Sequence, residues 1–224
     1  MPQQAADGVD GRERHNHGMD APRSGDLPQL ETARLRVTML APRHAAAVVD
    51  FMARNAVHFA PWEPPRPDDF LTQAYWTDQG ERAIAGYRAG RMLRWVASLR
   101  ENPQRIVARA NFSEVILGPF RSCLLGYQVD ASCEGRGLMT ETLEATIAFA
   151  FERWNLHRIE ANHLPENVRS ARLLARLGFE RVGVARNYLF IAGAWRDHVI
   201  NQRIHPRFDD AAVRGDVLSS KDAG

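Results

Sequence analysis

The stretch that decides how this chain folds is Val-Asp-Ala-Ser-Cys-Glu-Gly-Arg-Gly-Leu-Met-Thr-Glu, residues 129–141. The apolar run before it, Cys123–Val129, is short enough for a buried strand. After it, apolar side chains recur at helical spacing, at Leu143, Ile147, Ala150, Phe151 and Trp154. Gly135 and Gly137 therefore lie on a strand-to-helix turn. There, free backbone N–H groups and the helix dipole can hold a phosphate that approaches the main chain closely. A turn of this kind can also simply connect a strand to a helix without binding any ligand.

This turn differs from two common phosphate sites. It lacks the lysine of a P-loop and the third glycine of a dinucleotide-binding fingerprint. The only lysine of the chain is Lys221, close to the C-terminus. The sequence therefore argues against P-loop nucleotide hydrolysis, pyridoxal phosphate and any lysine Schiff base.

Length and composition indicate an ordinary globular protein. The chain has 224 residues, of which 45% are hydrophobic and 25% charged, so one core is expected. We expect a domain over residues 31–206, a disordered extension over residues 1–30 and a flexible tail over residues 207–224. A net charge of +2 gives no strong electrostatic case for direct nucleic-acid binding and leaves local basic patches open. No apolar segment has transmembrane length, and the two cysteines are typical of free thiols, so no membrane association and a cytoplasmic location are expected.

The periodicity predicts an alternation of strands and helices. Strands are predicted at about 35–39, 93–99, 105–117, 122–129, 157–163, 181–191 and 195–204. Helices are predicted at about 42–55 and 68–89, from the glycine turn to about 153, and at 168–177. The proline-rich segment 58–65 is expected to be a rigid, non-helical loop. The predicted fold is α/β, with a mixed central sheet of about seven strands flanked by helices.

The glycine turn resembles the coenzyme A pyrophosphate loop of the GNAT acetyltransferases, whose pattern is Gln/Arg-x-x-Gly-x-Gly/Ala. Residues 134–139 fill this frame, with Glu134 at the Gln/Arg position and Met139 at the last small position. The predicted element order is also the order of that family. A second match, to the family's other coenzyme A motif, comprises Asn167-Val168-Arg169-Ser170, Leu173 and Leu177-Gly178-Phe179.

Further segments are similar to the ribosomal-protein alanine N-acetyltransferases of the Rim type. They are residues 59–64, 110–113, 125–127, 174–179, 188–189 and 195–199. This resemblance covers about residues 31–206 and implies acetyl-coenzyme A as cosubstrate, with no metal. The positions that it assigns to the coenzyme are Tyr127, Val129, Ala131, Gly135, Arg136, Gly137, Leu138, Met139, Thr140, Asn167 and Ser170. On the strand these contacts would be main-chain, and an ordinary strand core is equally compatible with Tyr127, Val129 and Ala131.

The resemblance also suggests catalytic residues. Asn167 matches a position that contacts the pantetheine arm, and it could equally cap the helix that follows. Ser170 matches a serine near the sulfur, whereas the tyrosine that many family members use as proton donor is replaced by Leu174. The usual carboxylate base is replaced by Asn187, so the candidate bases are Glu160, which is preferred, and Glu114. A structural ion pair with an arginine is the alternative role for Glu160.

The implied acceptor is a protein N-terminal α-amine, with alanine of a ribosomal protein as the first candidate. Trp62, Glu63, Asn111 and Tyr188 are the expected acceptor-binding residues. Association with the ribosome is then possible, as a monomer or a homodimer. Two alternatives stay open: acetylation of a small amine such as an antibiotic or amino acid, and a non-catalytic ribosome-assembly or acyl-coenzyme A-binding protein.

Overall fold

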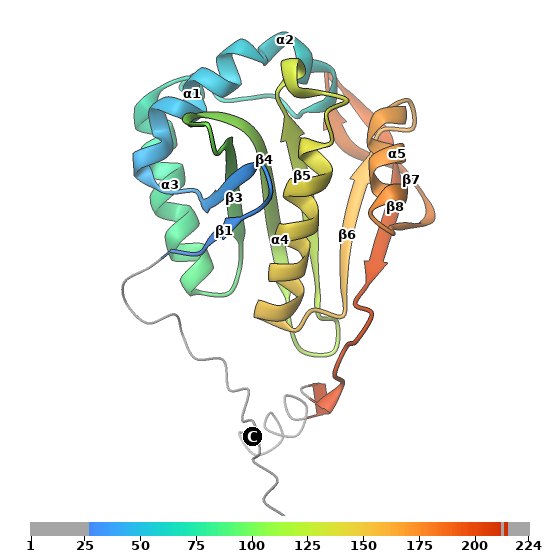
Figure 1. Cartoon of the computed structure of the whole chain (residues 1–224). Helices are drawn as coiled ribbons and strands as arrows, with labels where there is room; N and C mark the ends of the chain where they lie inside the picture. Colours follow the sequence, from blue (N-terminus) through green and yellow to red (C-terminus); the bar gives the residue numbers. More distant parts are fainter. Residues whose placement is uncertain (1–26, 212, 215–224) are drawn as a thin grey trace, which may run out of the picture.

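The computed structural model describes residues 27–211 and 213–214, which form one mixed eight-stranded sheet with helices on both faces (Figure 1). The order across the sheet is β1-β2-β3-β4-β5-β6-β8-β7, and only β5 and β6 run parallel. The strands are β1 (Gln29–Glu31), β2 (Leu35–Met39), β3 (Leu93–Leu99), β4 (Asn102–Ile116), β5 (Ser122–Val129), β6 (Arg158–His163), β7 (Glu180–Ile191) and β8 (Ala194–Ile204). The predicted α/β class and mixed sheet are confirmed.

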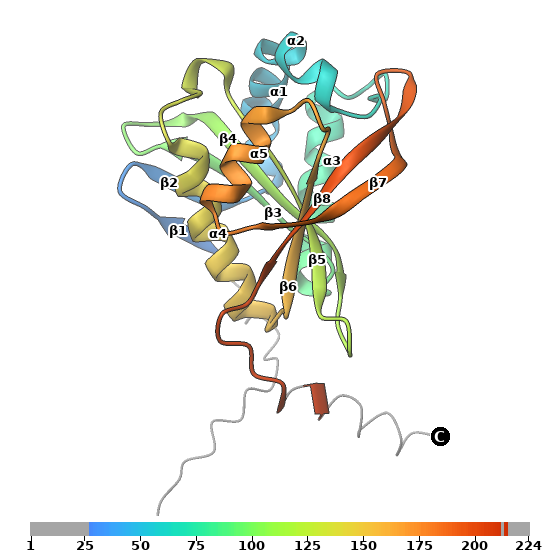
Figure 2. The same cartoon turned by 90° about the vertical axis from the view of Figure 1, so that its right-hand side faces the viewer.

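The helices form a layer on each face of this sheet. In Figure 2, α4 and α5 lie on one side of the strands, and α1 and α3 lie on the other. The helical segments are η1 (Pro42–His44), α1 (Ala45–Arg54), α2 (Ala56–Phe59), η2 (Ala60–Trp62), α3 (Gln73–Arg88), η3 (Ala131–Cys133), α4 (Leu138–Trp154) and α5 (Val168–Arg176). The central strands are consequently buried on both faces, and β3 has four consecutive buried residues, from Trp95 to Ser98.

The parallel pair at the centre of the sheet separates after a short contact. Residues Ser122–Leu124 of β5 pair with Arg158–Glu160 of β6, and beyond these positions the two strands have no register partners in each other. The rest of β5, up to Val129, keeps its pairing only with β4. The sheet therefore opens into a V at the end where β5 leads into the glycine turn.

The segment before α3 differs from its prediction. Residues 58–65 were expected to be non-helical, but α2 and η2 continue the helical path as far as Trp62. Pro61 is tolerated because it lies in the first turn of η2, where its missing N–H is not needed. The predicted start of the next helix at Asp68 is also wrong. Thr72 caps α3 instead, since its hydroxyl accepts the Tyr75 N–H at 3.2 Å.

Two strand boundaries also differ. The predicted sheet lacked β1, which is too short to show an alternating pattern but pairs with β2 from Gln29 to Glu31. The long strand β4 begins at Asn102 rather than near residue 105, with Pro103 close to its start, where proline is tolerated. Most of the predicted N-terminal extension, and residues 212 and 215–224 of the tail, lie outside the described residues. None of the helices described here is long and apolar enough to cross a membrane.

Candidate active site

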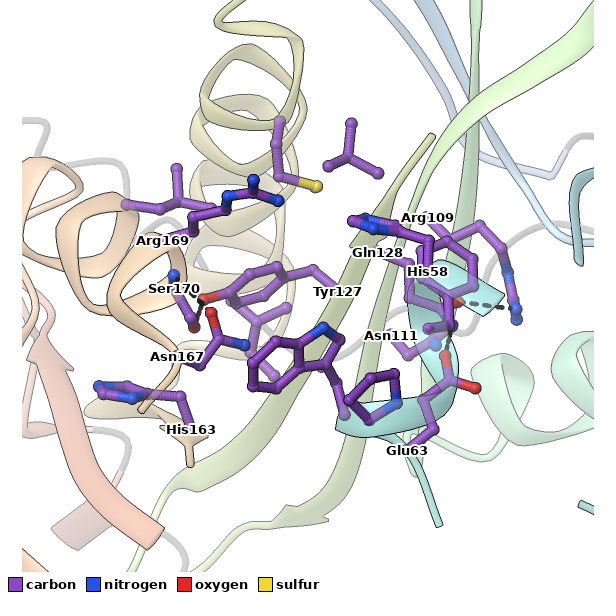
Figure 3. Close-up of a pocket in the computed structure, with 18 of the residues that line it drawn as sticks. His58, Glu63, Arg109, Asn111, Tyr127, Gln128, His163, Asn167, Arg169 and Ser170 are labelled. Atoms are coloured by element: carbon purple, nitrogen blue, oxygen red, sulfur yellow. Dashed lines mark hydrogen bonds between the residues drawn. The ribbon is translucent and has the colours of Figure 1, made fainter. Parts of the chain in front are cut away.

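A cleft of ≈ 1850 Å³ lies where β5 and β6 separate. Consecutive side chains of a strand point to opposite faces, and β5 shows this at the cleft. Tyr127 extends toward α5, where its hydroxyl lies 2.6 Å from Ser170 Oγ, whereas Gln128 extends toward η2 and donates to Glu63 (Figure 3). The cleft therefore has two halves, one formed by α4 and α5 and the other by α2, η2, α3 and the neighbouring strands.

The glycine turn forms one wall of the first half. Gly135 and Gly137 adopt φ of 70° and 75°, a left-handed conformation that other residues rarely take. A Cβ on Gly135 would meet nothing within 4 Å, and one on Gly137 would meet only Arg34 Nη2 at 3.5 Å. Gly137 is the N-cap of α4 and has no side chain with which to cap it. The first N–H groups of α4 therefore face an open space suited to an anion.

The outer side of this turn is fixed by a residue far away in sequence. Arg34 donates to the carbonyl of Arg136 at 2.8 Å and pairs with Glu141 of α4 at 2.6 Å. On the inner side, Asp130 accepts hydrogen bonds from Arg54 and from the N–H and hydroxyl of Ser132. Burial raises the pKa of Asp130, but these hydrogen bonds outweigh it and hold the pKa well below its ordinary value. The turn is thus anchored from both sides.

The N-terminus of α5 supplies the second wall. Asn167 caps this helix, since its Oδ1 accepts the Ser170 N–H at 3.0 Å, and its amide nitrogen points into the cleft (Figure 3). Both roles considered for Asn167 are therefore compatible with its position. The hydroxyl of the buried Ser170 pairs with that of the half-buried Tyr127 beside it. Burial raises the pKa of Tyr127 to about 12 against the opposing effect of its bond to Ser170, so this phenol keeps its proton.

Positive charge surrounds the same half of the cleft. Arg169, Arg172 and Arg176 of α5 all line it. Glu134, at the position where the family pattern has Gln or Arg, accepts from Arg169 at 2.5 Å and lies 3.2 Å from His58 Nε2. The contact of Glu134 with Arg169 partly offsets the negative charge that this substitution brings beside a phosphate site.

The other half contains three of the expected acceptor-binding residues, Trp62, Glu63 and Asn111. Glu63 is already engaged, because its two carboxylate oxygens accept from Gln128 and Arg66. It is therefore not a free carboxylate facing a substrate amine. Asn111 has a buried Oδ1 without a hydrogen-bond partner in the described part of the chain.

Five residues that were predicted for the site, including the alternative base, do not line the cleft. Glu160 lies in the paired part of β6, with Arg158 at 3.3 Å, and does not line the cleft. Its position fits the alternative role, an ion pair with an arginine, and the role of Glu160 as base stays an untested prediction. Ala131 donates its N–H to Asn55 Oδ1 and is not a lining residue, and Arg136 is exposed and does not line the cleft either. Tyr188 does not line the cleft itself, although its hydroxyl accepts from the lining residue Asn162 at 3.2 Å. The alternative base, Glu114, is exposed and also lies outside the cleft.

Three functional candidates are missing from the sequence prediction. The Tyr127 side chain was not considered, because that position was assigned through its backbone alone. The imidazoles of His163 and His198 are buried and line the cleft, and His198 packs against the Tyr188 ring at 5.3 Å. The alternation of β6 places His163 on the face of Ile159 and Ala161, whereas no pattern in β8 and no motif marked His198.

The protein-family model for the acetyltransferase (GNAT) domain matches residues 34–180. The chain belongs to this acetyltransferase family. The match contains the glycine turn, the α5 N-terminus and β3 to β6, so the walls of the cleft belong to the conserved domain of this family. Among the described residues, no cluster of three His, Cys, Asp or Glu side chains could hold a metal.

Similar proteins narrow this assignment. The chain is 37% identical to the ribosomal protein uS5 alanine N-acetyltransferase of Escherichia coli, over 80% of this chain and 91% of that one. The structure of a ribosomal-protein-S5-alanine acetyltransferase from Vibrio fischeri superposes with a TM-score of 0.78 at 30% identity, covering 81% and 99% of the two chains. RimJ of Mycobacterium smegmatis, solved with a coenzyme A disulfide, gives a TM-score of 0.72 at 28% identity, covering 87% and 94%.

Proposed function

We propose that this protein transfers the acetyl group of acetyl-coenzyme A to the N-terminal α-amine of a protein, with an alanine-initiated ribosomal protein as the first candidate. The observation that supports this most is the cleft, which joins the phosphate-type turn of α4 to a second half beyond β5. At ≈ 1850 Å³ the cleft is large enough to hold the coenzyme in one half and a second substrate in the other. The identity to the Escherichia coli enzyme supports the same acceptor class.

The residues of the first half fit the coenzyme. The left-handed glycines leave open the space that a Cβ would occupy, and the α4 N–H groups face it. These groups, with Arg169, Arg172 and Arg176, would hold the pyrophosphate. The backbone of Tyr127 and Val129, on the part of β5 that β6 does not pair, would hold the pantetheine arm. When bound, acetyl-coenzyme A supplies the acetyl group as a thioester.

We assign the role of proton donor to the hydroxyl pair of Tyr127 and Ser170. In many members of the family a tyrosine has this role, but its position here is occupied by Leu174. Leu174 is buried and apolar, so it cannot take this role. Ser170 lies at the start of α5 beside Asn167, and Tyr127 keeps its proton at neutral pH. We assign Ser170 as the hydrogen-bond donor to the departing sulfur and Tyr127 as the group that orients its hydroxyl.

We infer that none of the carboxylates that line the cleft is the proton acceptor. The acidic residues that line the cleft are Glu63, Glu134 and Glu166, and each is paired with an arginine. Imidazole is a common proton acceptor in enzymes, and three histidines among the described residues line the cleft. His58 lies 3.2 Å from Glu134 in the coenzyme half, so we assign the role to His163 or His198. A strong base is not required, because an α-amine with a reference pKa of about 7.7–8.0 is already partly neutral.

The test is an acceptor comparison followed by intact-mass spectrometry. The full-length enzyme and acetyl-coenzyme A are incubated with an Ala-initiated peptide, with the same peptide blocked at its N-terminus but containing an internal lysine, and with a panel of small amines. We expect one acetyl group on the free N-terminus and little on the lysine, since less than about a thousandth of an amine of pKa about 10.4 is neutral at pH 7. Faster turnover of a lysine or a small amine would contradict the proposal.

A further inference from the structure

The acceptor half of the cleft contains a buried guanidinium that no carboxylate neutralises in the described part of the chain. Arg109 of β4 is only 5% exposed. Its Nη1 donates to Gln128 Oε1 at 3.1 Å and to Met52 Sδ at 3.4 Å, and its Cζ lies 4.6 Å from the Trp76 ring centroid. Its Nε has no hydrogen-bond partner. The contacts of Arg109 are thus an amide, a thioether and an aromatic ring.

A second arginine increases the local charge. Arg94 of β3 also lines the cleft and donates to Gln79 Oε1 at 2.7 Å. Burial and, to a smaller extent, the charge of Arg94 together lower the pKa of Arg109 to about 10, against the opposing effect of Glu63. Glu63, the carboxylate that opposes this lowering, is itself paired with Arg66 and accepts from Gln128, and neither Arg94 nor Arg109 has an ion pair with it. Taking a charge out of water is costly unless it is paired, so this half of the cleft is complementary to a second carboxylate.

The strand register places this charge beside the point where an amine can be held. Arg94 is the register partner of Asn111, Asn111 of Gly126, and Arg109 of Gln128. Residues opposite each other, and residues two apart on one strand, share a face, so all these side chains point to the same side. Gly126 is exposed, and a Cβ there would meet nothing within 4 Å. The space over Gly126, opposite Asn111, is therefore free for a substrate.

Asn111 requires a hydrogen-bond donor, whereas the two arginines require an acceptor. Its Oδ1 is buried without a partner and needs an N–H donor, while the arginines need an acceptor with negative charge. Asn111 and Arg109 are two residues apart on β4, about 7 Å along the strand. A peptide spans at most about 3.6 Å per residue. A peptide whose α-amine lies near Asn111 can therefore present an acidic side chain to the arginines from one of its next few residues.

We propose that the acceptor is recognised by an Asp or Glu at its second, third or fourth residue, which pairs with Arg94 and Arg109. This inference rests on the proposed N-terminal acetylation and adds the sequence preference of the acceptor. Asn111 holds the α-amine over Gly126, and the two arginines fix the register of the peptide behind it. Bidentate pairing with a carboxylate is the contact that a guanidinium makes best.

The first test varies the peptide and leaves the enzyme unchanged. A difference between peptides therefore cannot come from a misfolded enzyme variant. Ala-initiated peptides that carry one Glu at position 2, 3, 4 or 8 are compared with the same peptides carrying Gln, by kcat/KM in an intact-mass assay with the full-length enzyme. A charge-assisted hydrogen bond gives about a 10- to 100-fold Glu-over-Gln ratio, which we expect at one or more of positions 2 to 4. The ratio at position 8 should be near one.

Two variants then assign the preference. Arg94→Gln should bring the Glu-over-Gln ratio close to one. The control is Arg82→Gln, because Arg82 is an exposed arginine of α3, paired with Asp78, that does not line the cleft, so this variant should keep the ratio. A ratio near one at positions 2 to 4, with the peptides still acetylated, overturns this inference alone. A preference that survives in Arg94→Gln also overturns it. If no peptide is acetylated, the proposed function fails, and this inference fails with it.

Discussion

The turn before α4 can be tested by giving Gly137 a side chain. In Gly137→Val the residue must keep φ near 75° or the turn must rearrange, and a left-handed conformation costs a non-glycine residue about 1–3 kcal/mol. The new Cβ meets only Arg34 Nη2, at the ordinary contact distance of 3.5 Å, so little further strain arises inside the protein. Gly137 lines the cleft as the N-cap of α4, so the added methyl groups crowd the backbone where the pyrophosphate is expected to approach.

The expected loss of binding follows from those N–H groups. A hydrogen bond to a charged group contributes about 1.5–3 kcal/mol, so losing one or two of them weakens acetyl-coenzyme A binding by about 10- to 1,000-fold or more. Calorimetric titration of the purified variant measures this affinity. Thermal unfolding measures the strain, for which a decrease in Tm of about 2–4 °C per kcal/mol is expected for a domain of this size.

Gly178→Val is the matched control. Gly178 follows α5 with φ of 76°, has nothing within 4 Å of a Cβ, and does not line the cleft. It should therefore lose a similar amount of stability and keep its affinity for the coenzyme. Near-normal affinity in a folded Gly137→Val, with the same decrease in Tm as Gly178→Val, would refute the assignment of this turn to the pyrophosphate.

Three further outcomes are expected. Ser170→Ala should lower kcat by about 10- to 100-fold with little change in coenzyme affinity, and Tyr127→Phe should lower it less, in steady-state and titration measurements. Asp130→Asn should cost about 3 kcal/mol in urea unfolding near neutral pH, because it breaks a buried ion pair. Since the folded-state pKa of Asp130 is lowered, this stabilisation is present above the unfolded pKa of about 3.9 and is lost as the pH falls below it, so the difference from wild type should shrink in acid. Glu160→Gln should leave kcat/KM and its pH profile unchanged. A clear decrease in kcat/KM would instead support Glu160 of β6 as the base.

The sequence predicts local parts of this molecule well. The strand, glycine turn and helix from Ser122 to Trp154 were predictable because each signal lies within a few residues of the structure it determines. The cap of α5 at Asn167 is predictable for the same reason. Pro61 misled the prediction, because proline disrupts the interior of a helix but is tolerated in its first turn.

Contacts between distant segments could not be predicted in this way. The hydroxyls of Tyr127 and Ser170 meet across 43 positions of sequence, and Leu174 alone wrongly suggested that no tyrosine reaches this site. The position of Glu160 depends on where β5 and β6 stop pairing, which no residue type marks. Arg109 was not singled out, because an arginine in a strand is ordinarily exposed, and only the packing of Trp76 and Met52 shows that it is buried.

The short contact between β5 and β6 has a consequence for cooperativity. Three register pairs join the first five strands to the three that follow, so the backbone of the sheet is almost interrupted at its centre. A ligand lying between the diverging strands would serve as a substitute strand and couple the two parts. Amide protons on the cleft side of β5 should then exchange with solvent quickly in the free protein and slowly in the complex. The coenzyme would in this way contribute to the continuity of the sheet as well as to the reaction.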